Sequence, residues 1–532
     1  MDAPRADATS GSGTGATGTA NMTASAASGL SWSVLSIAAL VVANLAYTAT
    51  VSRLLDPADF GLVAMANLVV LFGQYFARMG LASALVQKPE LTDEEIRAAS
   101  TAGFVIGVVC FGLVWLLAPA VAVLFHTPEV TPVLRGLGAS FLFMGWSMTG
   151  LGLLRRELRF RALSVISVGG YVVGYLVVGI GLALLGAGVW SLVAAIVAST
   201  LIQAVWQFAL RPHPLRPVLG WRHYRAVCGY GTRLSIAHVL DYIGSNLDTF
   251  TVARIASTAT LGQYSRAYYL VFQPLGNYMS AALTNVVFTT LSRVQGNVER
   301  LRRGYLSVMS LGALLVFPLS AGMAVAAPEL IEAVLGPQWG AAVGLVPWFA
   351  LAGACHVASQ LSQSLAEARA ELNRSVAVQV GYLVVLAALI VLALQFTSRE
   401  VWLISAAVAV AELLRYLGYL VLARSVLDLR AAQVSQAHVP AIFAGVGVAL
   451  AVAAARWVLT GAPVLAVLAA EIAVGAIALV LCIRVCPATA VRAELWFRLE
   501  SADLLGPPDG RRRRVASLVV GPPDRAVSEV QR

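Results

Sequence analysis

About fourteen long apolar runs decide what this 532-residue sequence can fold into. Each run approaches the roughly 20 residues that a helix needs to cross a bilayer core of about 30 Å. Within lipid, a helix pairs its own backbone groups, which an open strand cannot do. Hydrophobic residues make up 59% of the chain and charged residues 12%, which excludes a soluble, a disordered and a disulfide-stapled secreted protein. The sequence therefore predicts an all-α polytopic membrane protein with about 14 transmembrane helices.

The basic residues between the predicted helices predict how the helices are oriented. If the N-terminus is cytoplasmic, the loops after even-numbered helices hold 19 basic residues and the loops after odd-numbered helices hold 5. This alternation follows the positive-inside rule, so we expect both termini in the cytoplasm. We attribute the formal net charge of +10 to cytoplasmic loops and expect no nucleic-acid partner. The helices are expected near residues 30–52, 61–86, 99–122, 131–153, 162–185, 187–210, 232–253, 262–292, 305–327, 340–364, 374–395, 400–422, 438–459 and 463–484.

Two segments 201 residues apart indicate an internal repeat. One reads RLLDPADFGLVAMA from Arg53, and the other reads RIASTATLGQYSRA from Arg254. In each, the arginine closes one predicted helix and a glycine, Gly61 or Gly262, opens the next. An even number of helices separates the copies, so they share one orientation, as in parallel repeats related by an axis along the membrane normal. Two lobes of about six helices around a midplane cavity are typical of alternating-access transporters.

The predicted organisation has five parts. Residues 1–28, rich in Ala, Ser, Gly and Thr, are expected to be a disordered cytoplasmic segment. Residues 29–225 are expected to form the N-lobe with helices 1–6, and residues 226–430 the C-lobe with helices 7–12. Residues 431–486 add the two C-terminal helices, and residues 487–532 are expected to be a disordered, arginine-rich cytoplasmic tail.

Polar side chains follow helical spacing within several of the predicted spans. Polar groups inside a membrane are costly, and those aligned on one helix face usually point into the protein or into a hydrated cavity. The alternative is that single Asn and Gln residues serve only as hydrogen-bonding contacts between helices. The candidate cavity-lining residues are Asn44, Asn67, Gln74, Ser245, Asn246, Gln273, Asn277, His356, Gln360, Gln363 and Glu367.

Ionisable residues within the spans carry further hypotheses. Asp241 and Asp248, on one face of the span at 232–253, are candidates for binding a proton or cation, or for balancing a cavity arginine. Arg78 and Arg266 lie near the ends of their spans, where they either face the cavity or extend to the membrane surface.

Three further ionisable residues lie within the predicted spans. The i, i+3 spacing of Glu412 and Arg415 predicts a local ion pair. The pattern identifies no partner for Glu471 in the last predicted helix.

Several kinds of chemistry have no matching motif. The chain's one lysine, Lys88, is followed by Pro89, which excludes the G-K-[ST] end of a P-loop nucleotide site. The five cysteines form no C-x-x-C pair, and we expect no metal site and no cofactor. The loops on the predicted outer side are short, which disfavours a membrane-embedded glycosyltransferase or polymerase. The sequence favours a transporter over an enzyme.

Several segments between residues 30 and 365 together resemble one known family. The residues RLLDPADFG from Arg53 to Gly61 and LGQYSRA from Leu261 to Ala267 are similar to those of Wzx-type polysaccharide flippases. These flippases belong to the multidrug/oligosaccharidyl-lipid/polysaccharide (MOP) exporter superfamily. The supporting segments are Gly80-Leu81, 84–87, Leu158-Arg159-Phe160, 186–193 (GAGVWSLV), 246–248 and 335–339 (LGPQW).

The resemblance implies a MATE-like fold and the flipping of a polyprenyl-pyrophosphate-linked oligosaccharide to the outer leaflet of a bacterial cytoplasmic membrane. Without an ATP site, the energy is expected from a gradient of H⁺ or Na⁺. Asp241 or Asp248 then binds the coupling ion, and Arg78 and Arg266 meet the pyrophosphate, since guanidinium groups suit phosphate oxygens. The implied partners are the lipid-linked substrate, membrane lipids and other polysaccharide-assembly proteins.

Three alternatives stay open at this stage. A drug/cation antiporter of the same superfamily shares the fold but typically has twelve helices and a more apolar cavity. A lipid II flippase of that superfamily differs in its substrate and its arginine pattern. A membrane-embedded glycan polymerase or ligase belongs to another class and needs a large external loop, which the predicted topology lacks.

Overall fold

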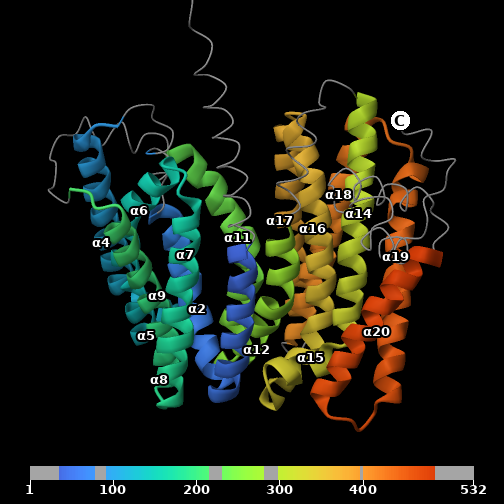
Figure 1. Ribbon diagram of the computed structural model, residues 1–532, viewed down its shortest axis with the longest axis horizontal. Coiled ribbons are helices and arrows are strands. Elements are labelled where there is room, and N and C mark those ends of the chain that lie inside the picture. The colour runs from blue at the N-terminus through green and yellow to red at the C-terminus, as the bar shows by residue number, and fades with distance from the viewer. Residues whose placement is uncertain are drawn as a thin grey trace, which may run out of the picture. The chain divides into compact units, whose positions relative to one another are not determined.

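In the computed structural model of the chain, helices are the only regular elements among the residues that the structure describes (Figure 1). These residues are 35–77, 85, 91–214, 231–280, 298–395 and 400–485. Among these described residues, twelve helical stretches, some made of two or three consecutive helices, are long and apolar enough to cross a membrane. The all-α polytopic architecture predicted from the apolar runs is thereby confirmed.

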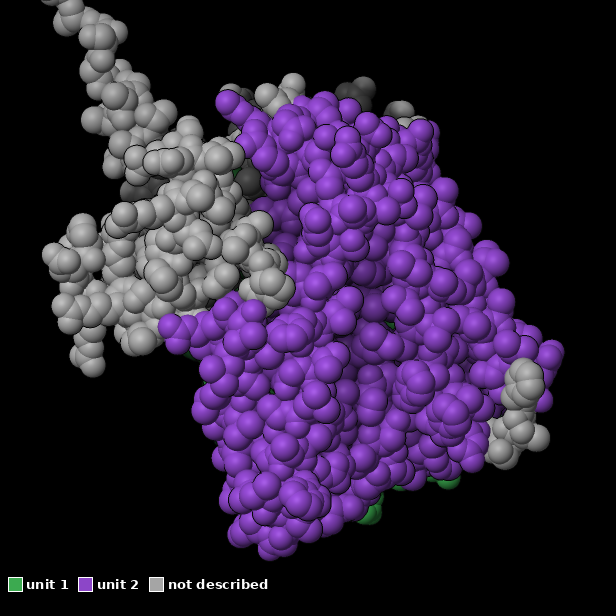
Figure 2. Space-filling view, turned by 90° about the vertical axis from the view of Figure 1, so that its right-hand side faces the viewer, with its two compact units in different colours: residues 1–245 green, residues 246–532 purple. Residues whose placement is uncertain are grey.

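The chain divides into two compact units, residues 1–245 and residues 246–532. The boundary falls within α11 (Gly231–Ile255), whereas the predicted lobe boundary at residues 225 and 226 stays a prediction. Unit 1 contains the helices Leu35–Leu54, α2 (Pro57–Ala77), α4 (Asp93–Phe125), α5 (Val130–Gly138), α6 (Ser140–Arg156), α7 (Phe160–Tyr171), η1 (Val172–Gly179), α8 (Ile180–Leu184) and α9 (Val189–Leu210). Unit 2, drawn in purple in Figure 2, contains α12 (Thr258–Ala267), η2 (Tyr268–Met279), α14 (Val298–Val325), α15 (Ala327–Val334), η3 (Pro337–Leu345), α16 (Val346–Ala368), α17 (Leu372–Gln395), α18 (Val401–Leu427), α19 (Ala431–Val458) and α20 (Val464–Val485).

Twelve of the fourteen predicted spans coincide with helices that could cross a membrane. The other two are those predicted at 232–253 and 262–292. Helices lie at both places, namely α11 and the continuous pair α12–η2, although neither is among the candidate spans found in the described residues. Part of the second predicted span, residues 281–292, lies outside the described residues, so the number fourteen stays a prediction.

The repeat predicted around Arg53 and Arg254 reappears in the backbone. One helix ends at Leu54 and the other at Ile255, one residue after each arginine, and the next helix starts at Pro57 or Thr258. The Leu55 N–H donates to the Val51 carbonyl at 3.0 Å, and the Ala256 N–H donates to the Val252 carbonyl at 2.9 Å. These donors and acceptors differ by the same 201 residues as the sequence motifs, so both copies break their helices in the same way.

Small residues bring α4 and α6 of unit 1 close together. A side chain at Gly145 would place its Cβ 2.3 Å from the Gly103 carbonyl oxygen, and one at Gly107 would place it 2.6 Å from the Phe141 carbonyl oxygen. Helices in membranes associate through such close backbone approach, because burial of apolar groups provides no driving force there. The glycines of these two helices therefore fix how they pack.

The core of unit 2 surrounds α14 and α16. α14 packs against α16 and α19, α16 packs against α18, and α19 packs against α20 (Figure 1). Tyr305 of α14 is 1% exposed, and its hydroxyl lies 3.0 Å from the Ser362 hydroxyl of α16. Tyr416 of α18 belongs to the same buried cluster. The Tyr305–Ser362 contact thus joins two helices of this core through a pair of buried hydroxyls.

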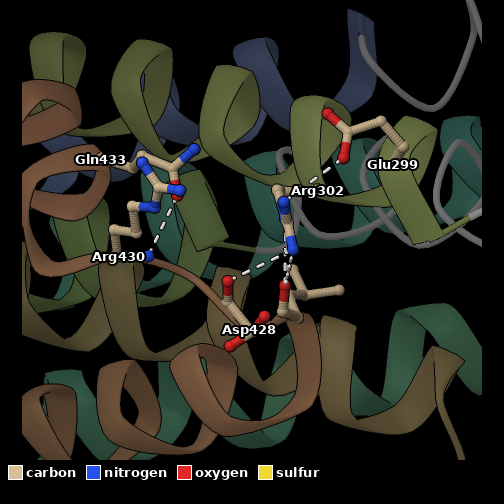
Figure 3. Close-up of polar contacts among 6 residues, drawn as sticks. Glu299, Arg302, Asp428, Arg430 and Gln433 are labelled. Carbon is tan, nitrogen blue, oxygen red and sulfur yellow. Dashed lines mark hydrogen bonds and ion pairs between the residues drawn. The ribbon is translucent and has the colours of Figure 1, made fainter.

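An arginine at the start of α14 caps the end of α18 (Figure 3). The Arg302 guanidinium donates to the Leu427 carbonyl from Nε at 3.0 Å and from NH2 at 2.9 Å. It also donates to the Asp428 carbonyl at 3.2 Å and lies 3.4 Å from the Glu299 carboxylate. The last carbonyls of a helix lack partners within the helix and favour a nearby cation. Arg302 therefore joins the start of α14 to Leu427 at the end of α18, 125 residues later in the sequence.

Candidate functional site

A buried carboxylate lies on α11, about two turns before the break between α11 and α12. Asp248 is 3% exposed, and the Tyr264 hydroxyl donates to its Oδ2 at 2.5 Å. The break at residues 256–257 turns α12 back along α11, which brings these two side chains together across 16 residues. A carboxylate removed from water is costly unless it is hydrogen-bonded or paired. Asp248 is therefore placed where gain or loss of a proton or cation changes the local energy strongly.

A series of aromatic rings runs from Tyr264 to α16. The Tyr264 ring lies edge-on to Phe349 with centroids 5.1 Å apart, and Phe349 contacts Tyr268 at 5.6 Å. Tyr268 stacks on Phe272 at 4.8 Å, and Phe272 meets the His356 imidazole at 5.3 Å. α12, η2 and α16 thus share one continuous aromatic contact. It links the surroundings of Asp248 to a second polar group.

That second polar group is an ion pair with a histidine. Glu412 and Arg415 of α18 are paired at 3.2 Å, as their i, i+3 spacing predicts, and their side chains are 3% and 5% exposed. The His356 Nδ1 atom of α16 lies 3.1 Å from the same Glu412 oxygen, Oε1. The Arg415 guanidinium lies 5.0 Å from the centre of the Tyr382 ring of α17. One carboxylate oxygen therefore joins a permanent cation and an imidazole.

The rest of the predicted α16 stripe forms contacts along its own helix. The Gln360 Nε2 atom lies 3.4 Å from the His356 Nε2 atom, and the Gln363 amide donates to the Glu367 carboxylate at 3.1 Å. Gln360 and Gln363 are half-buried and Glu367 is exposed. The four residues thus run from the buried ion pair to the surface, and their predicted role in lining a cavity stays a prediction.

The other predicted site residues of unit 2 lie on α11, α12 and η2. Asn246 and Gln273 are half-buried. Arg266 is half-buried as well, and its guanidinium lies 5.9 Å from the centre of the Tyr269 ring. The backbone of Asn277 is helical, but its side chain lies outside what the structure describes.

In unit 1, the predicted residues are spread over three helices. Asn44 accepts a hydrogen bond from Thr48 at 3.4 Å, whereas Asn67 and Gln74 of α2 are half-buried and Ser245 of α11 is exposed. The neighbouring Tyr242 hydroxyl donates to the Leu68 carbonyl, which attaches the first half of α11 to α2. The side chain of Asp241 and the whole of Arg78 lie outside the described residues.

The sequence patterns did not predict that several of the motifs similar to those of polysaccharide flippases contact one another. Gln263 of LGQYSRA donates to the Gln338 carbonyl of LGPQW at 2.9 Å and accepts from the Ala342 N–H at 3.1 Å. Tyr264 of the same motif binds Asp248, which belongs to a third motif. The available signal was the adjacent polar side chains of Gln263 and Tyr264 within LGQYSRA, which indicate specific hydrogen bonding along that helix.

In unit 1, two motifs are joined in a similar way. The Asp59 carboxylate of RLLDPADFG accepts a hydrogen bond from the Val189 N–H of GAGVWSLV. Val189 is the first residue of α9, where free N–H groups and the helix dipole favour an anion. Residues of these motifs therefore make contacts that join helices which are distant in the sequence.

Comparison with known proteins identifies relatives in sequence and in structure. The family described as "Polysaccharide biosynthesis protein" matches residues 50–344, more than half of the chain. A membrane protein encoded in the cps region of Klebsiella pneumoniae is 25% identical over 350 residues, covering 65% of this chain and 71% of that protein. Lipopolysaccharide biosynthesis protein WzxC of Escherichia coli (strain K12) is 20% identical over 354 residues, with the same two coverages. Teichuronic acid biosynthesis protein TuaB of Bacillus subtilis (strain 168) is 23% identical over 353 residues, covering 65% of this chain and 72% of that protein.

Two solved structures share the fold. The lipid II flippase MurJ in its inward closed conformation has a TM-score of 0.66 and 11% identity, covering 84% of this chain and 98% of that one. A multidrug resistance MATE family transporter of the MOP superfamily, inward-facing, has a TM-score of 0.58 and 16% identity, covering 73% and 94%. The MATE-like fold expected from the sequence motifs is thereby confirmed.

Proposed function

Given that this chain belongs to the polysaccharide biosynthesis protein family, we propose that it flips a polyprenyl-pyrophosphate-linked oligosaccharide across the cytoplasmic membrane of a bacterium. The family match over residues 50–344 carries this proposal. It is supported by relatives named for lipopolysaccharide and teichuronic acid biosynthesis and by a fold shared with a lipid II flippase. The chain acts as a transporter for surface polysaccharide synthesis, not as an enzyme, and both of its termini are cytoplasmic.

The chemistry of the substrate fits the polar residues of the spans. Sugar hydroxyls bind to amide and hydroxyl side chains such as Asn67, Gln74 and Gln273, and a pyrophosphate binds to arginine. Arg266 is the described candidate, since it is half-buried beside Tyr269, and Arg78 is the second. The polyprenyl tail stays in the bilayer while the head group crosses, so the protein shelters only the polar part.

An ion gradient supplies the energy in this proposal. Asp248 is the coupling residue that the contacts support best, because it is buried with the Tyr264 hydroxyl as a donor. The His356–Glu412–Arg415 group lies in the same unit and is joined to it through aromatic rings. Asp241 is the other candidate. Binding of H⁺ or Na⁺ at Asp248 changes the charge at the contact between α11 and Tyr264 of α12. This change in charge favours one conformation over another.

A deletion strain tests the substrate class. Mass spectrometry of its lipid-linked oligosaccharides, combined with an impermeant glycosidase, is expected to find a complete repeat unit accumulated on the cytoplasmic face. Asp248→Asn and Arg266→Ala are expected to restore export poorly, and Arg303→Ala, an exposed arginine of α14, is expected to restore it fully. Intact surface polysaccharide with no accumulated intermediate would instead favour a drug/cation antiporter. Accumulated lipid II would identify a lipid II flippase.

A further inference from the structure

Three ionisable side chains meet where α15, α19 and α20 pack together in unit 2. α20 contacts both other helices, and α15 and the turn between α19 and α20 lie at the lower end of this unit in Figure 1. Glu471 of α20 is 1% exposed, and Glu329 of α15 has a side chain that is 13% exposed. Arg456 of α19 is 45% exposed and pairs with Glu329 Oε1 at 3.0 Å. None of these residues belongs to the network around Asp248 and Glu412.

Glu471 is buried, and no residue that the structure describes donates a hydrogen bond to it. Among the residues that the structure describes, neither of its carboxylate oxygens has a hydrogen-bond partner, and both are shielded from solvent. The second oxygen of Glu329, Oε2, is shielded and without a partner in the same sense. An ionised carboxylate with neither water nor a donor is strongly disfavoured, whereas the neutral acid is tolerated. The surroundings of Glu471 therefore favour a bound proton.

Glu412 provides an internal comparison. It is 2% exposed and also lies within a span, so its burial matches that of Glu471. It differs in having Arg415 at 3.2 Å and His356 at 3.1 Å from one of its oxygens. Burial alone thus does not distinguish the two glutamates. The Arg415 guanidinium stabilises the ionised form of Glu412. The lack of a donor among the described residues disfavours the ionised form of Glu471.

The charged groups around Glu471 are few. α15 contributes Glu329 and the exposed Glu332, and α19 contributes Arg456 near its end. The charged residues of α14, which also packs against α20, all lie between 299 and 303 at its start. Within α20 the other charged residue is Arg484 in its last turn. Apolar side chains cover the remaining sides, with Val448, Val452 and Leu468 in one cluster.

We propose that Glu471 and Glu329 form a proton-binding carboxyl pair, in which Glu471 carries the proton and Glu329 is paired with Arg456. Glu471 lies about 10 Å along the axis from the start of α20, and its charge interacts electrostatically with those of Glu329 and Arg456. When Glu471 loses its proton, two carboxylates compete for one guanidinium, and the contact of α20 with α15 and α19 weakens. The proton on Glu471 therefore stabilises the packing of α20 against α15 and α19. This site is independent of the proposed transport function.

Carbodiimide labelling tests the proposal on the full-length protein in lipid vesicles. Dicyclohexylcarbodiimide adds to a protonated carboxyl in an apolar site, and the adduct rearranges to a stable N-acylurea that retains the whole reagent. Peptide mass spectrometry then locates it. At a pH well above the ordinary glutamate pKa of about 4.3, the adduct on Glu471 is expected to exceed that on Glu412 by at least about tenfold, the ratio for one pH unit between their protonation equilibria. The Glu471 adduct is expected to disappear as the pH rises.

Neighbouring variants separate charge effects from burial. Glu329→Gln removes a negative charge, so the Glu471 adduct is expected to disappear at lower pH than in the wild type. Arg456→Gln removes a positive charge, so the adduct is expected to persist to higher pH. Glu332→Gln, an exposed glutamate of the same helix, is the matched control and is expected to leave the midpoint unchanged.

Three results would overturn the proposal. The first is equal labelling of Glu471 and Glu412 at a pH well above the ordinary glutamate pKa. The second is a Glu471 adduct whose amount does not change with pH. The third is suppression of the adduct by Na⁺ but not by K⁺ at constant pH, which would identify a sodium site in place of a proton site.

Discussion

Replacing Glu412 by leucine tests whether the buried ion pair of unit 2 acts as a unit. The change leaves Arg415, whose side chain is 5% exposed, without its carboxylate partner at 3.2 Å. A guanidinium cannot lose its charge under ordinary conditions, so its desolvation is no longer offset. Removing one member of a buried pair typically costs about 3–5 kcal/mol. We expect Glu412→Leu to lower the free energy of unfolding by that amount.

The double variant Glu412→Leu/Arg415→Met refines this test. Replacing both members of a buried pair with apolar side chains is often neutral or stabilising. The double variant is therefore expected to regain most of the stability that Glu412→Leu loses. Unfolding by sodium dodecyl sulfate in mixed micelles, followed by tryptophan fluorescence, measures all three proteins. A loss below about 1 kcal/mol in Glu412→Leu, with no recovery in the double variant, would refute the reasoning, since that is the range of exposed pairs.

The same unfolding assay checks three further expectations. Tyr264→Phe removes the donor to Asp248 and should cost about 1–3 kcal/mol; full additivity with Asp248→Asn would contradict the contact. Arg302→Ala frees the last carbonyls of α18 and should cost about 1.5–3 kcal/mol, whereas the exposed Arg303→Ala should be within about 0.5 kcal/mol of wild type. Equal effects of these two would argue against the cap. Gln263→Ala leaves the Ala342 N–H without its acceptor and should cost about 1–3 kcal/mol, and a neutral result would show that the LGQYSRA–LGPQW contact is dispensable.

Local patterns in the sequence predicted much of the helical framework. Apolar runs placed twelve spans where the structure has helices of sufficient length and hydropathy. The repeated arginines marked two helix ends that have equivalent backbone hydrogen bonds, whereas the following helices begin at Pro57 and Thr258, four residues before the predicted glycines. The spacing of Glu412 and Arg415 predicted an ion pair that is formed. In each case the information lies within about one helical turn or within one continuous span, where geometry fixes which residues are neighbours.

The contacts between distant segments could not be predicted in the same way. His356 and Glu412 are 56 residues apart, and Gln263 and the Gln338 carbonyl are 75 residues apart. These neighbours are set by which helices pack together, and hydropathy carries no information on that choice because every span is apolar. The partners of Asp248 and of the α16 stripe therefore became visible only in the folded chain. α11 carries several polar side chains and is not among the candidate spans of the described residues, so the span predicted at 232–253 stays a prediction.

Flipping by the purified protein tests the central proposal most directly. The full-length chain is reconstituted into vesicles containing a polyprenyl-pyrophosphate-linked oligosaccharide, and an ion gradient is imposed. An impermeant glycosidase outside the vesicles then measures how much of the oligosaccharide changes leaflet. The account predicts gradient-dependent exposure or protection of the sugar that the Asp248→Asn variant loses. Flipping rates equal to those of protein-free vesicles, under both H⁺ and Na⁺ gradients, would contradict it.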